Sequence, residues 1–375
     1  MEENYRICSR CIMDNASDPY ISFNEKGECN YCTSALQVMP ITYFPNEKGI
    51  EKLNDLIVKL KREGREKKYD CLMGISGGLD SAYLAYLGAK KWGLRICAVH
   101  IDDGFDTELA INNIRNLCKT ANIELINIKP NAEQYANITK TFMRAEVPNI
   151  AIPQDNILFA ILYKYARDYK IKYFLSGSNF ALESILQRGN TYNAYDLYHI
   201  KQLHKKFGQG SIRDLTFISQ YRRDIDRSFL GIKTVTPLDF IDYNKKKAIN
   251  ELNDFCGFQY YEAKHLENSL TKIIQLRWFY EKFKVDKRHS HLSSLIITGQ
   301  ITREEALYEI SKPMYDEKQM EVDVKMVLEK LGMSRNEFEE LISRPGKQHT
   351  DYPTDKCHIW FDRLLSIPGK LKKIL

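Results

Sequence analysis

Cys71-Leu72-Met73-Gly74-Ile75-Ser76-Gly77-Gly78-Leu79-Asp80-Ser81 is the stretch of the chain that decides its fold. Residues 69–75 predict a buried strand, and residues 80–91 have the apolar spacing of an amphipathic helix. Gly77 and Gly78 let the backbone approach an anion, while the start of the helix presents unpaired N–H groups and the positive end of its dipole. This order predicts an anion-binding loop at the carboxyl end of a sheet.

Apolar strands and amphipathic helices continue to alternate beyond the loop. Such alternation predicts an α/β fold with a doubly wound parallel sheet and helices on both faces. The further strands are expected at residues 94–101, 123–128 and 171–175, and the helices at 108–119, 155–169 and 180–187.

Side chains of the loop add to its chemistry. The hydroxyls of Ser76 and Ser81 can donate hydrogen bonds to phosphate oxygens, and the carboxylate of Asp80 can hold Mg²⁺. The loop lacks the Gly-x4-Gly-Lys-Ser/Thr pattern, and with it the lysine that works at a γ-phosphate. We therefore expect the loop to bind pyrophosphate, and hydrolysis at the γ-phosphate is disfavoured.

The hexapeptide resembles the Ser-Gly-Gly-x-Asp-Ser signature of the ATP pyrophosphatases, or PP-loop superfamily, which includes GMP synthetase, asparagine synthetase, tRNA thiolases and lysidine synthase. The resemblance implies an adenine nucleotide alpha hydrolase-like fold that cleaves ATP between the α- and β-phosphates. Two later segments resemble nucleotide-binding parts of that fold, and ordinary turns stay open as the alternative for both. They are 100–105, which contains Asp102, and 175–179, which contains Ser176, Gly177 and Ser178.

Four of the nine cysteines form the pairs Cys8-x2-Cys11 and Cys29-x2-Cys32, separated by 17 residues. Two such turns each direct two thiolates at one ion, which is the arrangement of a zinc ribbon. A segment of about 40 residues buries too little apolar surface to fold alone, so the metal would supply its folding energy. Because four protein ligands fill a tetrahedral site, we expect a structural Zn²⁺. A redox pair, an iron–sulfur cluster and free thiols stay open as alternatives.

The composition indicates a protein of the cytoplasm. Hydrophobic residues make up 43% of the 375 residues, and no apolar run approaches the roughly 20 residues that span a bilayer. The amino terminus lacks the features of a secretory signal. Lys and Arg outnumber Asp and Glu by 55 to 49 without clustering, which suits anionic small substrates and makes a nucleic-acid partner unlikely.

A closer resemblance covers nearly the whole chain. The cysteine pairs, the loop, residues 237–240, 264–269 and 286–296, and the following 299–307 together resemble the N-acetyl sugar amidotransferases of bacterial surface-polysaccharide and lipopolysaccharide biosynthesis. That family converts a sugar acetamido group into an acetamidino group. The resemblance implies ATP and Mg²⁺, an O-adenylyl imidate intermediate and an acetamido sugar, free or nucleotide-linked, as the acceptor.

Four domains or linkers are expected: a zinc ribbon at 1–40, a helical linker at 41–66, the ATP-binding α/β domain at 67–241 and a mainly helical region at 242–375. In the last region, Lys264, Lys287 and Arg288 are the candidate cations for charge that develops on pyrophosphate, because the loop itself has none. The alternative for Lys287 and Arg288 is an exposed basic run with His289 and His291.

Ammonia is expected from a separate protein. The chain begins Met1-Glu2, and none of its cysteines lies in a Gly-x-Cys-x-Gly nucleophile turn. The family resemblance suggests a glutaminase related to the glutaminase subunit of imidazole glycerol phosphate synthase, with or without a cyclase-like companion.

Two other functions stay open. A tRNA thiolase or related RNA-modifying enzyme also combines a zinc ribbon with this core, although thiolation usually needs a reactive cysteine pair, which is absent outside the ribbon. A non-catalytic nucleotide-sensing scaffold is the second, and the intact loop argues against it.

Overall fold

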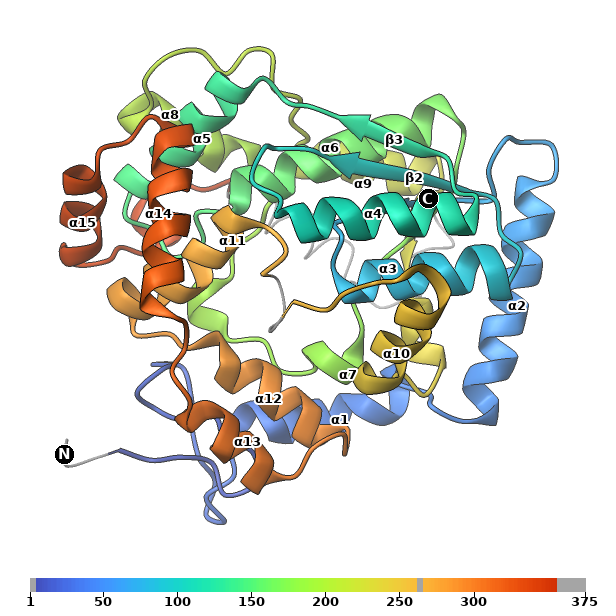
Figure 1. The fold of residues 1–375 in the computed structure, drawn as a ribbon, viewed down its shortest axis with the longest axis horizontal. Coiled ribbons are helices and arrows are strands. Elements are labelled where there is room, and N and C mark those ends of the chain that lie inside the picture. Colours follow the sequence, from blue (N-terminus) through green and yellow to red (C-terminus); the bar gives the residue numbers. More distant parts are fainter. Residues whose placement is uncertain (1–4, 262–265, 356–375) are drawn as a thin grey trace, which may run out of the picture.

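A computed structural model describes residues 5–261 and 266–355 of the chain, and its centre is one five-stranded sheet (Figure 1). The strand order is β3-β2-β1-β4-β5, and every neighbouring pair is parallel. The strands are β1 (Cys71–Gly74), β2 (Ile96–Ile101), β3 (Leu125–Ile128), β4 (Tyr173–Leu175) and β5 (Lys233–Val235). The predicted parallel α/β fold is confirmed. The first strand, β1, lies in the middle of the sheet, and the later strands are added on both sides of it. Folds of this kind bind ligands in the crevice where the strand order reverses, which is here beside β1 and β4.

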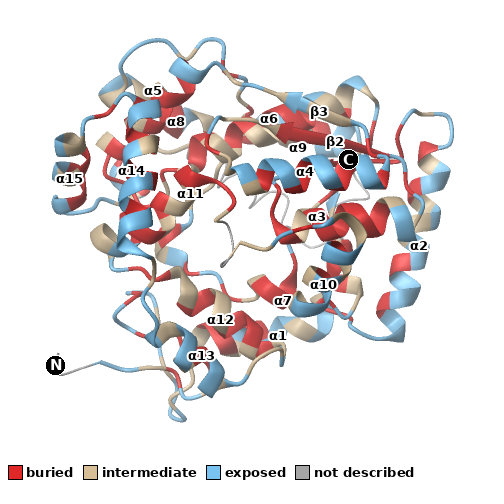
Figure 2. Cartoon of the chain, viewed as in Figure 1, coloured by how far each residue is buried: buried red, intermediate tan, exposed pale blue. Residues whose placement is uncertain are grey.

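Both faces of this sheet are covered by helices because its central strands are apolar on both sides. In β1, Leu72 belongs to one apolar cluster, whereas Cys71 and Met73 belong to the other, as expected for side chains that alternate along a strand. The buried residues accordingly form two layers against the sheet (Figure 2).

The first cluster packs under α5 (Ala132–Arg144), α6 (Ile152–Asp168), α8 (Leu197–Phe207), α11 (Ser269–Ile273), α14 (Glu317–Leu331) and α15 (Arg335–Ser343). The second packs under α1 (Asn30–Thr42), α2 (Glu47–Gly64), α3 (Leu79–Tyr86), α4 (Glu108–Ala121), α7 (Phe180–Glu183), α10 (Lys245–Cys256) and α12 (Lys287–Ile297). The remaining helices are α9 (Gln220–Phe229) and α13 (Arg303–Ser311). None of the helices in the described part of the chain is long and apolar enough to cross a bilayer.

Several elements differ from the sequence prediction in detail. The helix expected at 80–91 changes to a π-helix after Tyr86. α11 likewise continues as a π-helix from Ile274 to Lys282. The helix expected at 180–187 ends at Glu183. Thr302 caps α13 with a reciprocal hydrogen bond to Glu305, as the Thr-x-x-Glu pattern indicates.

Candidate functional site

The glycine-rich loop joins β1 to α3 at the carboxyl edge of the sheet. Gly77 has a φ of +79°, and a Cβ there would lie 2.8 Å from the carbonyl oxygen of Ala110. A Cβ on Gly78 would lie 2.6 Å from Oε1 of Glu267. Gly77 therefore requires glycine for both backbone conformation and space, whereas a side chain at Gly78 would displace the ends of Glu267 and Tyr261.

Hydrogen-bond donors converge on the inside of this loop. The hydroxyls of Ser76 and Ser81 lie 3.3 Å apart, and the N–H of Gly78 donates to Ser76 Oγ at 3.2 Å. The N–H of Leu79, at the start of α3, donates to the hydroxyl of Tyr261 at 2.9 Å. The loop therefore gathers backbone N–H and hydroxyl groups at the start of a helix, and its role in binding an anion stays a prediction.

The second predicted loop, residues 176–178, lies against the first. A Cβ on Gly177 would lie only 3.0 Å from the backbone nitrogen of Ser81, so the two loops touch because this residue has no side chain. Ser178 donates a hydrogen bond to Glu183. The structure thus brings together Ser76, Gly77, Gly78, Asp80 and Ser81 with Ser176, Gly177 and Ser178, which are far apart in the sequence.

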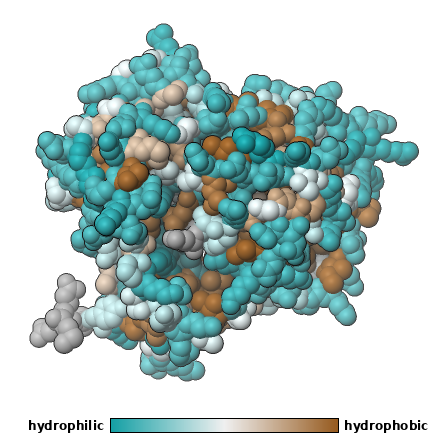
Figure 3. Space-filling model, in the orientation of Figure 1, coloured by the Kyte–Doolittle hydropathy of each residue, from teal (hydrophilic) through white to brown (hydrophobic). Residues whose placement is uncertain are grey.

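Two adjoining cavities open at this edge, and a hollow is visible near the centre of the corresponding face (Figure 3). A cavity of about 230 Å³ lies directly over the loop, and one of about 620 Å³ extends along the ends of β1, β2 and β4. Volumes of this size are typical of small-molecule sites. Five residues line both cavities: Ser76, Gly177, Glu183, Glu267 and His291.

Asp80 lines the smaller cavity and accepts a hydrogen bond from the hydroxyl of Tyr243 at 2.5 Å. Tyr243 is buried and stacks on Tyr83 with ring centres 5.6 Å apart. The aromatic pair therefore fixes the orientation of the carboxylate that we expect to hold Mg²⁺. An oxygen ligand at the mouth of an anion cradle suits that ion.

Asp102 and Asp103 face different surroundings. The ammonium of Lys129 lies 3.0 Å from Asp102, and although burial acts to raise the pKa of Asp102, this partner lowers it overall. Asp103 instead lines the larger cavity, where Tyr135 and Gln154 each donate to its Oδ2 at 2.9 Å. Of the two, Asp103 is the residue that contacts the cavity, and the role of Asp102 stays a prediction.

The larger cavity contains two ionisable groups with strongly shifted pKa values. Burial raises the pKa of Asp155 to about 7. Burial also lowers the pKa of Lys287 to about 8, and the charges of Asp18 and Glu183 limit that drop. Cavity residues with displaced pKa values are candidates for proton transfer.

The three predicted cations have separate outcomes. Lys264 lies outside the described residues. Lys287 lines the larger cavity, and its neighbour His289 is buried, so the alternative of an exposed basic run is wrong for these two residues. Arg288 is held by Asp286, with the closest pair of atoms 2.7 Å apart, and donates to the carbonyl of Lys312 at 2.9 Å. It is absent from the described lining of both cavities, and its catalytic role stays a prediction.

Other lining residues escaped the sequence analysis. Lys245, at the start of α10, and Tyr260 line the smaller cavity, with the ammonium 4.7 Å from the ring centre. Glu267 and His291 were visible only as members of resemblance segments. Because both residues are far from the loop in sequence, no local pattern indicates that they lie near it in the fold.

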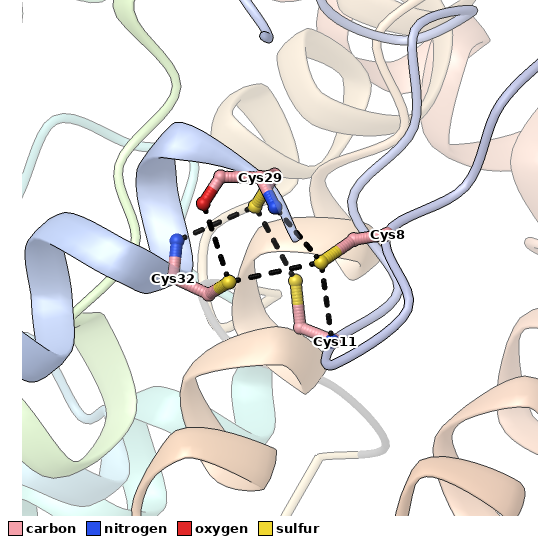
Figure 4. Close-up of side chains that lie close together, drawn as sticks. All are labelled: Cys8, Cys11, Cys29 and Cys32. Carbon is pink, nitrogen blue, oxygen red and sulfur yellow. Dashed lines mark hydrogen bonds between the residues drawn. The ribbon is translucent and has the colours of Figure 1, made fainter. Parts of the chain in front are cut away.

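The four amino-terminal cysteines converge at one point (Figure 4). Their Sγ atoms lie within 4.8 Å of one another, and all four side chains are fully buried. The N–H groups of Cys11 and Cys29 donate to the sulfur of Cys8 at 3.4 and 3.2 Å. Four enclosed thiols with N–H donors to sulfur fit a tetrahedral zinc ion, and Cys8, Cys11, Cys29 and Cys32 would hold it.

This cysteine cluster is attached to the carboxyl-terminal helices. His289 Nδ1 donates to the carbonyl of Ile12 at 2.6 Å, and Ser293 accepts from the N–H of Ile12 at 3.2 Å. Arg303 donates to the carbonyls of Cys8 and Cys11 at 3.0 and 3.1 Å. The cysteine turns are therefore fixed to α12 and α13.

Comparison with known proteins finds two family matches. Residues 50–216 match NAD synthase, and residues 267–365 match the C-terminal domain of WbpG-like proteins of lipopolysaccharide biosynthesis. An uncharacterized protein of Methanocaldococcus jannaschii is 22% identical over 312 residues, which cover 82% of this chain and 93% of that protein.

Similar solved structures have low TM-scores. NMN synthetase from Francisella tularensis is 15% identical with a TM-score of 0.36, over 72% of this chain and 98% of that one. The NH₃-dependent NAD synthetase of Campylobacter jejuni is 16% identical with a TM-score of 0.33, over 72% and 99%. The U34-tRNA thiolase of Methanococcus maripaludis is 15% identical with a TM-score of 0.32, over 72% and 84%.

Proposed function

We propose that this chain, which joins an NAD synthase-like PP-loop domain to a WbpG-like C-terminal domain of lipopolysaccharide biosynthesis, is an ATP-dependent amidotransferase that converts a sugar acetamido group into an acetamidino group. One observation carries the proposal. The cavity over the pyrophosphate loop adjoins a second, larger cavity, and Glu267 and His291 of the WbpG-like segment line both cavities. This arrangement leaves space for an acceptor beside a nucleotide.

The chemistry needs an activated oxygen. An amide carbon is a poor electrophile because its nitrogen donates into the carbonyl. The acetamido oxygen attacks the α-phosphorus of ATP, the bond to the bridging oxygen breaks, and pyrophosphate leaves. Ammonia then adds to the carbon of the O-adenylyl imidate, loses a proton, and AMP departs with the original acetamido oxygen. ATP, ammonia and the acetamido sugar thus become AMP, pyrophosphate and the amidine.

Residues of the loop serve the first step. The N–H groups at the start of α3 and the hydroxyls of Ser76 and Ser81 bind the departing pyrophosphate. A magnesium ion held by Asp80 would supply positive charge to the same group. Lys287 adds a cation from the larger cavity.

Asp155 serves the second step. Ammonia that adds to the imidate carbon carries a surplus proton, which must leave before AMP does. A carboxyl with a pKa of about 7 is half ionised at neutral pH and is matched to accept that proton. Its position in the lining of the larger cavity suits this role.

Ammonia would come from a partner glutaminase. At the described cysteines outside the cluster, burial raises the pKa of the thiols of Cys71, Cys97, Cys118 and Cys256, which disfavours the thiolate that glutamine hydrolysis requires; Cys357 lies outside the described residues. The same property disfavours a thiolase mechanism at these residues. The purified chain is expected to use ammonium but not glutamine, and addition of a glutaminase subunit should confer glutamine use.

The direct test uses ATP, Mg²⁺, ammonium and a panel of free and nucleotide-linked acetamido sugars. The expected product is lighter than the acceptor by about one mass unit, because NH replaces oxygen, and AMP and pyrophosphate form in equal amounts. AMP formation that depends on tRNA and ignores every sugar would contradict the proposal.

A further inference from the structure

The pyrophosphate loop is already in contact with two oxygen atoms from elsewhere in the chain. Ser76 Oγ donates to Oε1 of Glu267 at 3.3 Å, and the N–H of Leu79 donates to the hydroxyl of Tyr261 at 2.9 Å. Glu267 Oε1 would also lie 2.6 Å from a Cβ on Gly78, so the carboxylate sits against the loop backbone. The cradle therefore holds a carboxylate at the place where we expect phosphate oxygens.

The backbone on both sides of these residues is fixed. The N–H of Thr107 donates to the carbonyl of Glu267 at 3.0 Å, and the N–H of Ser269 donates to the carbonyl of Phe105 at 2.7 Å. On the other side, Asn113 exchanges two hydrogen bonds with the backbone of Gln259, at 2.9 and 3.0 Å. The first pair of contacts holds Glu267 beside the loop, and the second pair fixes the chain two residues before Tyr261.

The carboxylate of Glu267 is incompletely paired. The residue is only 7% exposed, and its Oε2 has no hydrogen-bond partner among residues 5–261 and 266–355. Burial raises the pKa of Glu267, and the charge of Asp80 raises it further. A buried carboxylate oxygen without a partner is costly, and a metal ion or another cation removes that cost.

Phosphate groups alone would make the electrostatics worse. ATP brings several negative charges into a cavity whose described lining already contains the carboxylates of Glu267, Asp80 and Glu183 beside the ammonium of Lys245. A divalent cation bound to the nucleotide would turn this repulsion into attraction, because the Oε2 atom of Glu267 could coordinate the cation.

We propose that Glu267 contacts the divalent cation that accompanies ATP, and that it thereby makes the pyrophosphate loop select metal-bound nucleotide over free nucleotide. The proposal rests on the proposed function, since it takes ATP as the ligand of the loop. Glu267, from the WbpG-like segment, would thus be a second carboxylate ligand of Mg²⁺ beside the expected ligand Asp80.

Isothermal titration tests this with ATP in either Mg²⁺ or EDTA, without sugar or ammonium so that no turnover occurs. The wild-type protein should bind ATP far more tightly with Mg²⁺. In Glu267→Gln, metal-free ATP should bind about tenfold more tightly than in the wild type, because a repulsive charge is gone, and Mg²⁺-bound ATP should bind more weakly. The ratio of the two affinities should therefore fall by more than about tenfold.

Tyr261→Phe is the matched control. It removes the other internal oxygen from the cradle, together with its hydrogen bond to Glu267, but it leaves the charge of the carboxylate in place, so the ratio of the two affinities should change far less than in Glu267→Gln. Thermal melting verifies that each variant is folded.

An unchanged ratio in folded Glu267→Gln would overturn the inference while ATP binding itself still stands. Failure of the folded wild-type protein to bind ATP in either condition would instead overturn the proposed function, and the inference with it.

Discussion

Replacement of Asp155 by asparagine should stabilise the protein, and the gain should increase with pH. The carboxyl lines the larger cavity, and burial raises its pKa from 3.8 to about 7. In the unfolded chain the group ionises near its ordinary value. Between the two pKa values, the unfolded state has therefore lost a proton that the folded state retains, and ionisation favours unfolding.

The magnitude follows from the size of the shift. A rise from 3.8 to about 7 is about three pKa units, equivalent to about 4 kcal/mol of unfolding free energy once the pH exceeds the folded-state value. When folding raises the pKa of a carboxyl, the free energy of unfolding is unaffected below the pKa in the unfolded chain. It then falls as the pH rises to the pKa in the folded protein. Because solvent reaches the cavity, we take this as the upper limit. Between about pH 5.5 and about pH 8 the advantage of Asp155→Asn should grow by about 2 kcal/mol.

Urea unfolding of both proteins at several pH values measures this difference. Asp55→Asn, which alters an exposed carboxyl on α2, is the control and should change stability little at any pH. Asp155→Asn should also lose amidine formation while it still binds ATP, because it no longer accepts a proton. A stability difference that is flat across this pH range would refute the assigned environment of Asp155.

Three further predictions concern the rest of the site. Wild-type protein should contain about one zinc per chain, and Cys29→Ser should lose the metal and lower the melting temperature; an unchanged melting curve would contradict a structural zinc. Asp80→Ala should reduce turnover by about 10²-fold or more with the fold retained, and Tyr243→Phe should reduce it less, because only the orientation of Asp80 is lost; full activity of Asp80→Ala would exclude the loop assignment. The Lys287 ammonium is charged below its pKa of about 8, so pyrophosphate formation should slow as the pH rises through that value, and Lys287→Arg should abolish this decline; a wild-type rate that stays flat through pH 8 would exclude Lys287 as the cation.

The fold was predictable because its signals are local. The continuous apolar runs of β1 and β2 and the glycine pair at the first turn can be recognised without knowledge of distant residues. Strand β5 has the sequence Lys233-Thr234-Val235 and is mostly exposed, so it lacks the apolar run that would predict a strand. Its place at the sheet edge depends on pairing with β4.

Positions within the site were predictable only in part. Asp102 and Asp103 are adjacent, and sequence cannot tell which of two neighbours contacts a cavity, because successive side chains point in different directions. Lys287 and Arg288 present the same problem on a helix, where consecutive residues are about 100° apart. Glu267 and Lys245 reach the loop from more than a hundred residues away, through tertiary contacts that no local pattern encodes.

The cysteine cluster is attached to α12, a helix that contributes to the lining of the larger cavity. α12 begins at Lys287, and its first turn carries His289, which donates to the carbonyl of Ile12, the residue after Cys11. The ribbon therefore fixes the helix whose first residue faces the larger cavity. Ser294 Oγ on the same helix accepts the N–H of Ile185, just beyond α7 and its Glu183. A metal held by the four cysteines would thus stabilise two of the segments that line the larger cavity, so its removal should disturb that cavity as well as the cysteine cluster.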